Sequence, residues 1–263
     1  MFDDTSPPTP VVGMGDHQNP PSTLAFRFAD SASDKFWRVE WAHDAAAVNW
    51  GKTGTTGKYQ LKEFGSSDEC EREARKLAAA KLKKGYLPYP EFAPDAHFYV
   101  DDEEVGPHRL TSHPRFRAAF TADFYYDCAD EWSPFGSDEG SDTLTQLVED
   151  LRKNRSLDLA KFPARMIETY WDLTYRPAVD LSREAVQALV ATDETNTTQS
   201  DMVTYATAFA QIKITGRIDP ALKAAALNSL RRLEMAAEIL GWSTASQPSE
   251  TTRRMIADLE GFH

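Results

Sequence analysis

Hydrophobic and polar residues alternate in three short stretches near the start of the chain. In KFWRVEWAH the apolar residues from Trp37 to Trp41 occupy alternate positions, and Ala46 to Trp50 follows the same pattern. In GKYQLKEF, Lys58 and Lys62 fall on the side opposite the apolar residues. A period of two is typical of strands with one apolar face, and short turns join these strands. The pattern predicts an antiparallel meander whose third strand presents lysines to water.

The hydrophobic period then changes to that of a helix. Ser66 followed three residues later by Glu69 fits a capping box, and Gly85 is placed to end the helix. Between them Ala74, Leu77, Ala78 and Leu82 recur at helical spacing. We expect one amphipathic helix to cover one face of the sheet. Its exposed side would carry most of the basic residues, namely Arg72, Arg75, Lys76, Lys83 and Lys84.

The second half of the chain has a helical pattern. Asp219 precedes Pro220 as a helix cap, and Gly241 ends a long run of regularly spaced apolar residues. The spacing predicts about six helices between Ser112 and Trp242 and a short one near Glu250 to Leu259. The expected fold class is α+β, in which a small antiparallel sheet with one packed helix precedes an all-α helical domain.

Composition divides the chain into four predicted segments. Residues 1–23 hold five prolines among small polar residues and are expected to form a disordered tail. Residues 24–90 form the sheet and helix, 91–111 an acidic linker, and 112–263 an acidic helical domain. Charge changes sign between these parts: residues 24–90 carry 12 Lys+Arg against 9 Asp+Glu, whereas residues 91–150 carry 3 against 15. This asymmetry favours two domains with separate tasks.

The remaining global features exclude several classes of protein. A net charge of -12 argues against a protein that coats nucleic acid over its whole surface, but it allows a local cationic site. Two distant cysteines, Cys70 and Cys128, indicate neither a disulfide framework nor a zinc knuckle. We find no apolar stretch long enough for a membrane span and no export signal, so we expect a soluble, cytoplasmic protein without a cofactor.

The first module resembles the WGR domain. FWRVEW, then WGKTGTTGKYQLKEF, then a helix ending in KLKKGY are similar to that domain in poly(ADP-ribose) polymerases and in bacterial proteins related to a molybdate-metabolism regulator; the match covers Leu24 to Tyr86. In the polymerases the domain contacts DNA near a break. There the tryptophan packs on the terminal sugar, and the basic residue lies close to the backbone. The resemblance implies these roles for Trp50, Gly51 and Lys52.

One position departs from the family. Lys52 stands where the family usually has arginine, and lysine keeps the charge but loses the bidentate geometry, so we expect weaker and less selective contact. The predicted nucleic-acid-binding residues are Trp50, Gly51, Lys52, Lys58, Lys62, Arg72 and Lys76. Two alternatives stay open: Trp50 is a core residue with the lysines as a solvated face, or the module binds a protein.

An acidic segment follows. If a helix runs through Ala122 to Glu131, then Asp123, Asp127, Asp130 and Glu131 fall on one face, and Asp138 and Asp142 repeat the four-residue spacing in the next helix. Such a surface suits a basic protein partner or a divalent cation, although no EF-hand or HExxH motif accompanies it. DFYYDCADEWSPFGSDEGSDTL also resembles the YfeS-type bacterial proteins, which join a WGR domain to a helical region. That resemblance supports the architecture and implies no activity.

No catalytic motif is present. Cys128 beside Asp127, with His113 nearby in sequence, suggests a nucleophile, but acidic neighbours oppose thiolate formation. There is no P-loop, dinucleotide fingerprint or nucleophile elbow. We therefore expect a non-enzymatic binding protein that contacts DNA ends or backbone phosphates through the WGR-like module. The alternatives are an inhibitor- or immunity-type protein that binds a basic partner, and a metal-dependent hydrolase built on the aspartates.

Overall fold

The computed structural model describes residues 21–242 and 247–263. Most of the predicted tail, residues 1–20, lies outside the described residues. At its end the prediction was wrong, because Ser22 and Thr23 already belong to the first strand and pair with Trp41 and Glu40.

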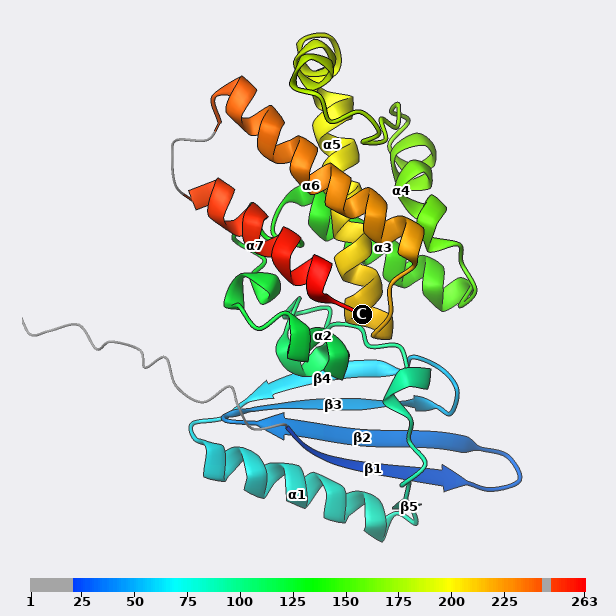
Figure 1. Cartoon of the computed structure of the whole chain (residues 1–263). Coiled ribbons are helices and arrows are strands. Elements are labelled where there is room, and N and C mark those ends of the chain that lie inside the picture. Colours follow the sequence, from blue (N-terminus) through cyan, green and yellow to red (C-terminus); the bar gives the residue numbers. More distant parts are fainter. Residues whose placement is uncertain (1–20, 243–246) are drawn as a thin grey trace, which may run out of the picture.

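A five-stranded antiparallel sheet forms the first part of the molecule. Its order is β4-β3-β2-β1-β5, and α1 lies across one face while the helical region covers the other (Figure 1). The predicted meander is confirmed, and two further strands extend the sheet on the side of its first strand. The strands are β1 (Ser22–Ala29), β2 (Asp34–Ala42), β3 (Ala45–Lys52), β4 (Lys58–Glu63) and β5 (Leu87–Pro88).

Helix α1 (Ser67–Lys83) forms where the capping signal predicts it. The Ser66 hydroxyl accepts a hydrogen bond from the Glu69 backbone N–H at 3.2 Å, which satisfies one of the free donors of the first turn. Its buried positions are the small residues Cys70, Ala74 and Ala78, so the helix axis lies close to the sheet. Together with the strand tryptophans they form a hydrophobic core separate from that of the helical region.

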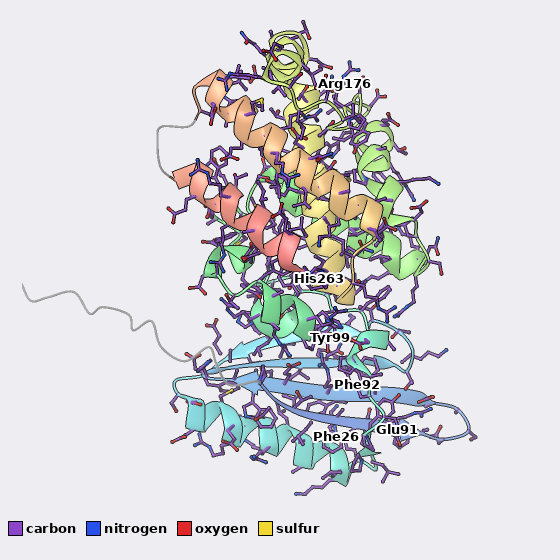
Figure 2. The ribbon with its side chains drawn as sticks, in the orientation of Figure 1. Phe26, Glu91, Phe92, Tyr99, Arg176 and His263 are labelled. Atoms are coloured by element: carbon purple, nitrogen blue, oxygen red, sulfur yellow. The ribbon has the colours of Figure 1, made fainter. Side chains whose placement is uncertain are left out.

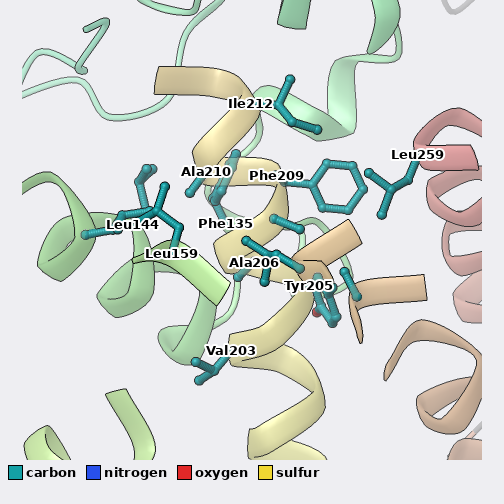
Figure 3. Packing of buried hydrophobic residues seen from close by; sticks show 14 of the residues in the cluster. Phe135, Leu144, Leu159, Val203, Tyr205, Ala206, Phe209, Ala210, Ile212 and Leu259 are labelled. Carbon is teal, nitrogen blue, oxygen red and sulfur yellow. The ribbon is translucent and has the colours of Figure 1, made fainter. Parts of the chain in front are cut away.

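The helical region is built around one long central helix. Five α-helices are assigned between residues 112 and 242, and the longest of them, α5 (Arg183–Thr215), is broken at Asp193, so it consists of two helical segments. The predicted number of about six is therefore confirmed, and the helix predicted near the C-terminus is present as α7. Helix α5 passes through the middle of the largest hydrophobic core, where Phe209 packs beside Leu259 (Figure 3). The helices are α2 (Pro114–Ala119), α3 (Asp138–Lys153), α4 (Phe162–Arg165), α5 (Arg183–Thr215), α6 (Pro220–Leu240) and α7 (Gln247–Gly261).

Residues 91–111 are packed between the two parts, although their composition predicts a linker. His97, Tyr99 and Val100 are buried. Tyr99 also accepts a hydrogen bond from Arg38 of β2 at 3.1 Å, and its backbone N–H donates to the Ile214 carbonyl of α5 at 2.9 Å. This segment therefore joins the sheet to the central helix through side-chain and backbone contacts.

The helix considered between Ala122 and Glu131 does not form. A short 3-10 helix covers Asp123–Tyr126, and turns follow it. Asp127 and Asp130 each accept a hydrogen bond from the backbone N–H two residues later, at 2.8 and 3.0 Å. These local bonds compete with the helical hydrogen bonds, which is why aspartate favours turns.

Candidate nucleic-acid interface

The WGK sequence ends strand β3, and the β3–β4 turn that follows it, called here the WGK turn, is held in one shape by hydrogen bonds. Asn49 is buried, and its side-chain amide donates to the carbonyls of Thr56 and Lys58 at 3.2 and 3.0 Å. Thr53 donates from its backbone N–H to the Asp34 carbonyl and from its hydroxyl to the Asp34 carboxylate. These bonds tie the β3–β4 turn to itself and to β2, so the side chains beside it are presented from a fixed base.

The glycines of the stretch serve this turn. Gly54 and Gly57 have positive φ values of 83° and 71°, which L side chains adopt with strain. A Cβ on Gly51 would lie 2.7 Å from the Gly57 Cα, and one on Gly57 would lie 2.6 Å from the Trp50 carbonyl oxygen. Gly51, the middle letter of WGK, is therefore required by the packing of one backbone segment on another.

Trp50 and the strand lysines lie on the same face of the sheet. Trp50 pairs with Trp37 on one side and Lys58 on the other, and Lys52 pairs with Lys35. Because residues two apart in a strand share a face, all of these side chains are on the face that α1 covers. Trp50 is half-buried against the core beneath α1. Trp50 is therefore partly a core residue, as one alternative held, and it also keeps part of its side chain accessible to a ligand, as the WGR resemblance implies.

The strand lysines are free of ion pairs. Lys35, Lys52 and Lys58 are exposed and Lys62 is partly exposed. None of the four forms an ion pair with another described residue. Lys35 was absent from the predicted set, although its position two residues before Trp37 on an alternating strand was a usable signal.

The cations of α1 differ from the strand lysines. Arg72 and Lys76 are exposed, as predicted, but they pair with Glu69 at 3.9 Å and Glu73 at 3.0 Å on the same helix. They also lie in the part of α1 that precedes Lys81, whose ammonium is 5.3 Å from the centre of the Trp37 ring. Since Trp37 pairs with Trp50, the C-terminal end of α1 is the end next to the WGK turn.

The six acidic candidates do not converge. Asp123 pairs with Arg109 at 2.7 Å, and Asp127 and Asp130 hold turns. The remaining three, Glu131, Asp138 and Asp142, are exposed. Among the described residues, which include all six, no group of three or more His, Cys, Asp or Glu side chains is placed to hold a metal ion. Asp123 and Asp127 line one cavity and Glu131 and Asp138 line another, so these carboxylates do not form the single site that a metal-dependent hydrolase would require.

A cavity of about 790 Å³ opens between the β2–β3 turn and α2. Cys128, Asp127 and His108 line it. His113, the histidine considered as a base for Cys128, is instead buried, and its Nδ1 accepts the Arg115 backbone N–H at 3.1 Å. The proposed nucleophile therefore lies in a cavity without the base that sequence proximity suggested.

No helix within the described ranges is both long and apolar enough to cross a lipid bilayer.

Comparison with known proteins identifies both halves of the architecture. Residues 22–93 match the WGR domain, a domain type that binds nucleic acid in general. The Escherichia coli protein called uncharacterized protein YfeS is 47% identical over 237 residues, which cover 90% of this chain and 97% of YfeS. The E. coli protein YehF is 39% identical over 62 residues, covering 24% of this chain and 23% of YehF.

Among solved structures, a Bacteroides fragilis protein from a structural genomics consortium is 27% identical. The match covers 50% of this chain and 39% of that one, with a TM-score of 0.26. The match to YfeS extends through both the sheet and the helical region. The chain belongs to the family of E. coli YfeS, in which a WGR domain precedes a helical region.

Proposed function

We propose that this protein is a non-enzymatic nucleic-acid-binding protein that contacts DNA through the α1-side face of its sheet, at the WGK end. The observation that carries the proposal is the row formed by Lys35, Lys52 and Lys58 around Trp50, whose exposed ammonium groups form no ion pair with other described residues. Lysines without partners can neutralise phosphates and release counterions, whereas paired cations must first break an ion pair.

Each residue has a distinct part in the proposed contact. The accessible part of Trp50 stacks on a sugar or base at a DNA end, where such a face is not covered by the next base pair. Lys52 and Lys58 meet the phosphates on either side of it, and Lys62 extends the contact along β4. Arg72 and Lys76 contribute less, because glutamates of α1 already neutralise them.

The test is fluorescence anisotropy of labelled DNA with the full-length protein at low and moderate salt. Three duplexes are compared: intact, nicked, and blunt with a 5′ phosphate. We expect preference for the nick or the end. We also expect the Lys52→Ala/Lys58→Ala variant to bind DNA about 100-fold more weakly. The slope of its log affinity against log salt concentration should become shallower by the amount expected for the loss of about two phosphate contacts.

The matched control is Arg72→Ala/Lys76→Ala, which removes two cations from the same domain and should weaken binding by less than about fivefold. Loss of the end preference, without loss of affinity, in Trp50→Ala would place the tryptophan at the DNA terminus. Failure of the unmodified protein to bind any of the three duplexes at low salt would contradict the proposal.

A second candidate is a basic protein partner on the helical region. It is favoured by the exposure of Glu131, Asp138 and Asp142, which form no ion pair with other described residues. A labelled oligolysine peptide tests it: binding that the triple neutral variant Glu131→Gln/Asp138→Asn/Asp142→Asn abolishes would support this candidate. Binding unchanged by that variant would exclude this surface.

A further inference from the structure

A buried cluster of charged residues lies where the sheet meets the helical region. Arg38 and Glu40 of β2 point to the face opposite α1 and form an ion pair at 2.8 Å; their side chains are 3% and 2% exposed. Arg117 of α2 reaches the same carboxylate from the helical side and forms a second ion pair with it. The Glu40 carboxylate is thus the counter-ion of two guanidinium groups.

The other groups around Arg38 are neutral. Tyr59 and Tyr99 accept hydrogen bonds from its guanidinium at 3.2 and 3.1 Å, and burial raises the pKa of both phenols. Burial, and then the nearby Arg38 charge, lowers the pKa of His97 to about 3, so this imidazole is uncharged at neutral pH. The cluster therefore carries two positive charges and one negative charge.

An uncompensated charge in such a place is costly, because burial removes the water that would solvate it. The Nε–H of Arg38 adds to this cost, since it is buried and has no hydrogen-bond partner in the described part of the chain. Both features would be relieved by an anion that accepts hydrogen bonds beside these two arginines.

A groove gives access to this cluster. It has a volume of about 400 Å³ and is bordered by Arg38, Glu40 and Arg117. Its walls are largely apolar: Tyr89, Phe92 and Tyr99 line it together with Pro88, Pro90, Pro94 and Pro114. Phe92 and Tyr99 lie where the sheet meets the helical region (Figure 2), and both rings lie within 5 Å of the Arg38 guanidinium carbon.

We propose that this groove binds a small ligand in which a carboxylate or phosphate is attached to a flat apolar body. The anion contacts Arg117, whose side chain is 14% exposed, and reaches the Arg38 Nε–H when the Phe92 ring turns aside. The apolar body lies on the prolines and Tyr89. This site is on the sheet face opposite the proposed DNA contact, and it stands independently of that function.

The test is titration calorimetry of the full-length protein with three probes: benzoate, phenyl phosphate and inorganic phosphate. We expect saturable binding of benzoate or phenyl phosphate, and at least about tenfold weaker binding of inorganic phosphate, which has no apolar body. The first two probes distinguish a carboxylate ligand from a phosphate ligand.

Two variants locate the binding. Arg117→Gln removes the excess positive charge and leaves the Arg38–Glu40 pair, so affinity should fall about tenfold or more. Ala25→Leu places a larger side chain on the groove lining without changing any charge, and it should weaken binding similarly. It keeps the proposal testable if Arg117→Gln fails to fold.

Arg115→Gln is the control, since Arg115 lies on the same helix, is exposed and does not border the groove. It should bind the probes as the unmodified protein does. The proposal is overturned if no probe binds, if inorganic phosphate binds as well as the aromatic anions, or if the Ala25→Leu variant keeps full affinity.

Discussion

The two faces of the sheet hold their charges in opposite ways. On the α1 side, Lys35, Lys52 and Lys58 reach solvent and form no ion pair within the described part of the chain. On the other side, Arg38 and Glu40 are buried and bonded to groups from three segments of the chain. Solvent-exposed lysines keep their hydration, so their charge costs little folding free energy and they can bind a phosphate. A buried ion pair stabilises the contact between two parts of the molecule only while every partner is present, because a single buried charge is strongly destabilising.

The difference shows how one small sheet can present a binding surface on one face and pack against the helical region with the other. Strand residues alternate between faces, so adjacent positions such as Trp37 and Arg38 have unrelated surroundings and unrelated roles. Substitutions of the buried charges Arg38 and Glu40 should therefore change stability, and substitutions of the exposed lysines on the α1 side should change DNA binding.

The largest expected effect is on the buried face. Among the described residues, Glu40 provides the only carboxylate bonded to Arg38 and Arg117, so Glu40→Gln leaves the buried Arg38 and the partly buried Arg117 without a counter-charge. We expect the free energy of unfolding to fall by about 3–5 kcal/mol, measured by urea denaturation. The control Glu71→Gln breaks the exposed pair with Arg75 on α1 and should cost less than about 1 kcal/mol. A similar fall in the free energy of unfolding in both variants would contradict the proposed difference between the buried and the exposed ion pair.

The next effect concerns pH. The pKa of His97 is lowered to about 3 in the folded protein, chiefly by burial, while an unfolded chain has an ordinary value of about 6.5. Between these values the unfolded chain binds a proton that the folded protein does not, so stability falls as pH falls. From pH 7 to pH 5 the loss due to His97 should be about 2 kcal/mol.

The measurement compares urea unfolding of the unmodified protein with that of His97→Phe at both pH values. Phenylalanine suits the site because Phe36, Phe92 and Tyr99 already surround it. The variant should lose about 2 kcal/mol less than the unmodified protein over this interval. Taking the difference between the two proteins removes the contributions of other titrating groups. Equal losses would show that His97 is protonated while folded.

A smaller effect is expected on the binding face. Lys35→Glu reverses one charge opposite Lys52, and we expect DNA binding to weaken about tenfold without a change in stability. The measurement is the anisotropy titration together with a thermal melt. Lys153→Glu, on the exposed surface of α3, is the matched charge reversal away from the sheet and should change affinity less than about twofold. Equal effects of the two reversals would mean that only net charge matters.

The smallest effect tests whether the helical region supports the WGK turn. Arg155 donates to the Gly54 carbonyl at 3.3 Å and to the Ala96 carbonyl at 3.1 Å, so it links the turn to the segment beyond it. Arg155→Ala should weaken DNA binding about threefold, because the turn becomes less fixed. Arg155→Lys should restore part of the loss if the charge is what matters. No change in either variant would show that the turn is held by its own bonds alone.

The first module could be predicted well from its sequence because its signals are local. The alternation around Trp37, the cap at Ser66 and the glycines of the turn each act within a few residues. Strand β1 was missed although Leu24, Phe26 and Phe28 alternate there, because it borders the proline-rich segment assigned to the tail. In the acidic segment the spacing of the aspartates suggested one face of a helix, and this prediction was wrong. Asp127 and Asp130 instead accept hydrogen bonds from the backbone two residues later, which stabilises turns.

By itself the sequence determined three of the five strands, the first helix and the helical second half, since each depends on spacing along the chain. The family and the WGK residues followed from the resemblance of its motifs to the WGR domain. Only the tertiary structure decided which cations are free and which are neutralised, because pairing depends on what lies across a strand or helix. It also decided that residues 91–111 are packed between the two parts, and that Arg38, Glu40 and Arg117, the last 77 residues beyond Glu40, meet beside one groove. Long-range contacts of this kind leave no periodic trace in a sequence, because they join segments whose separation along the chain is arbitrary.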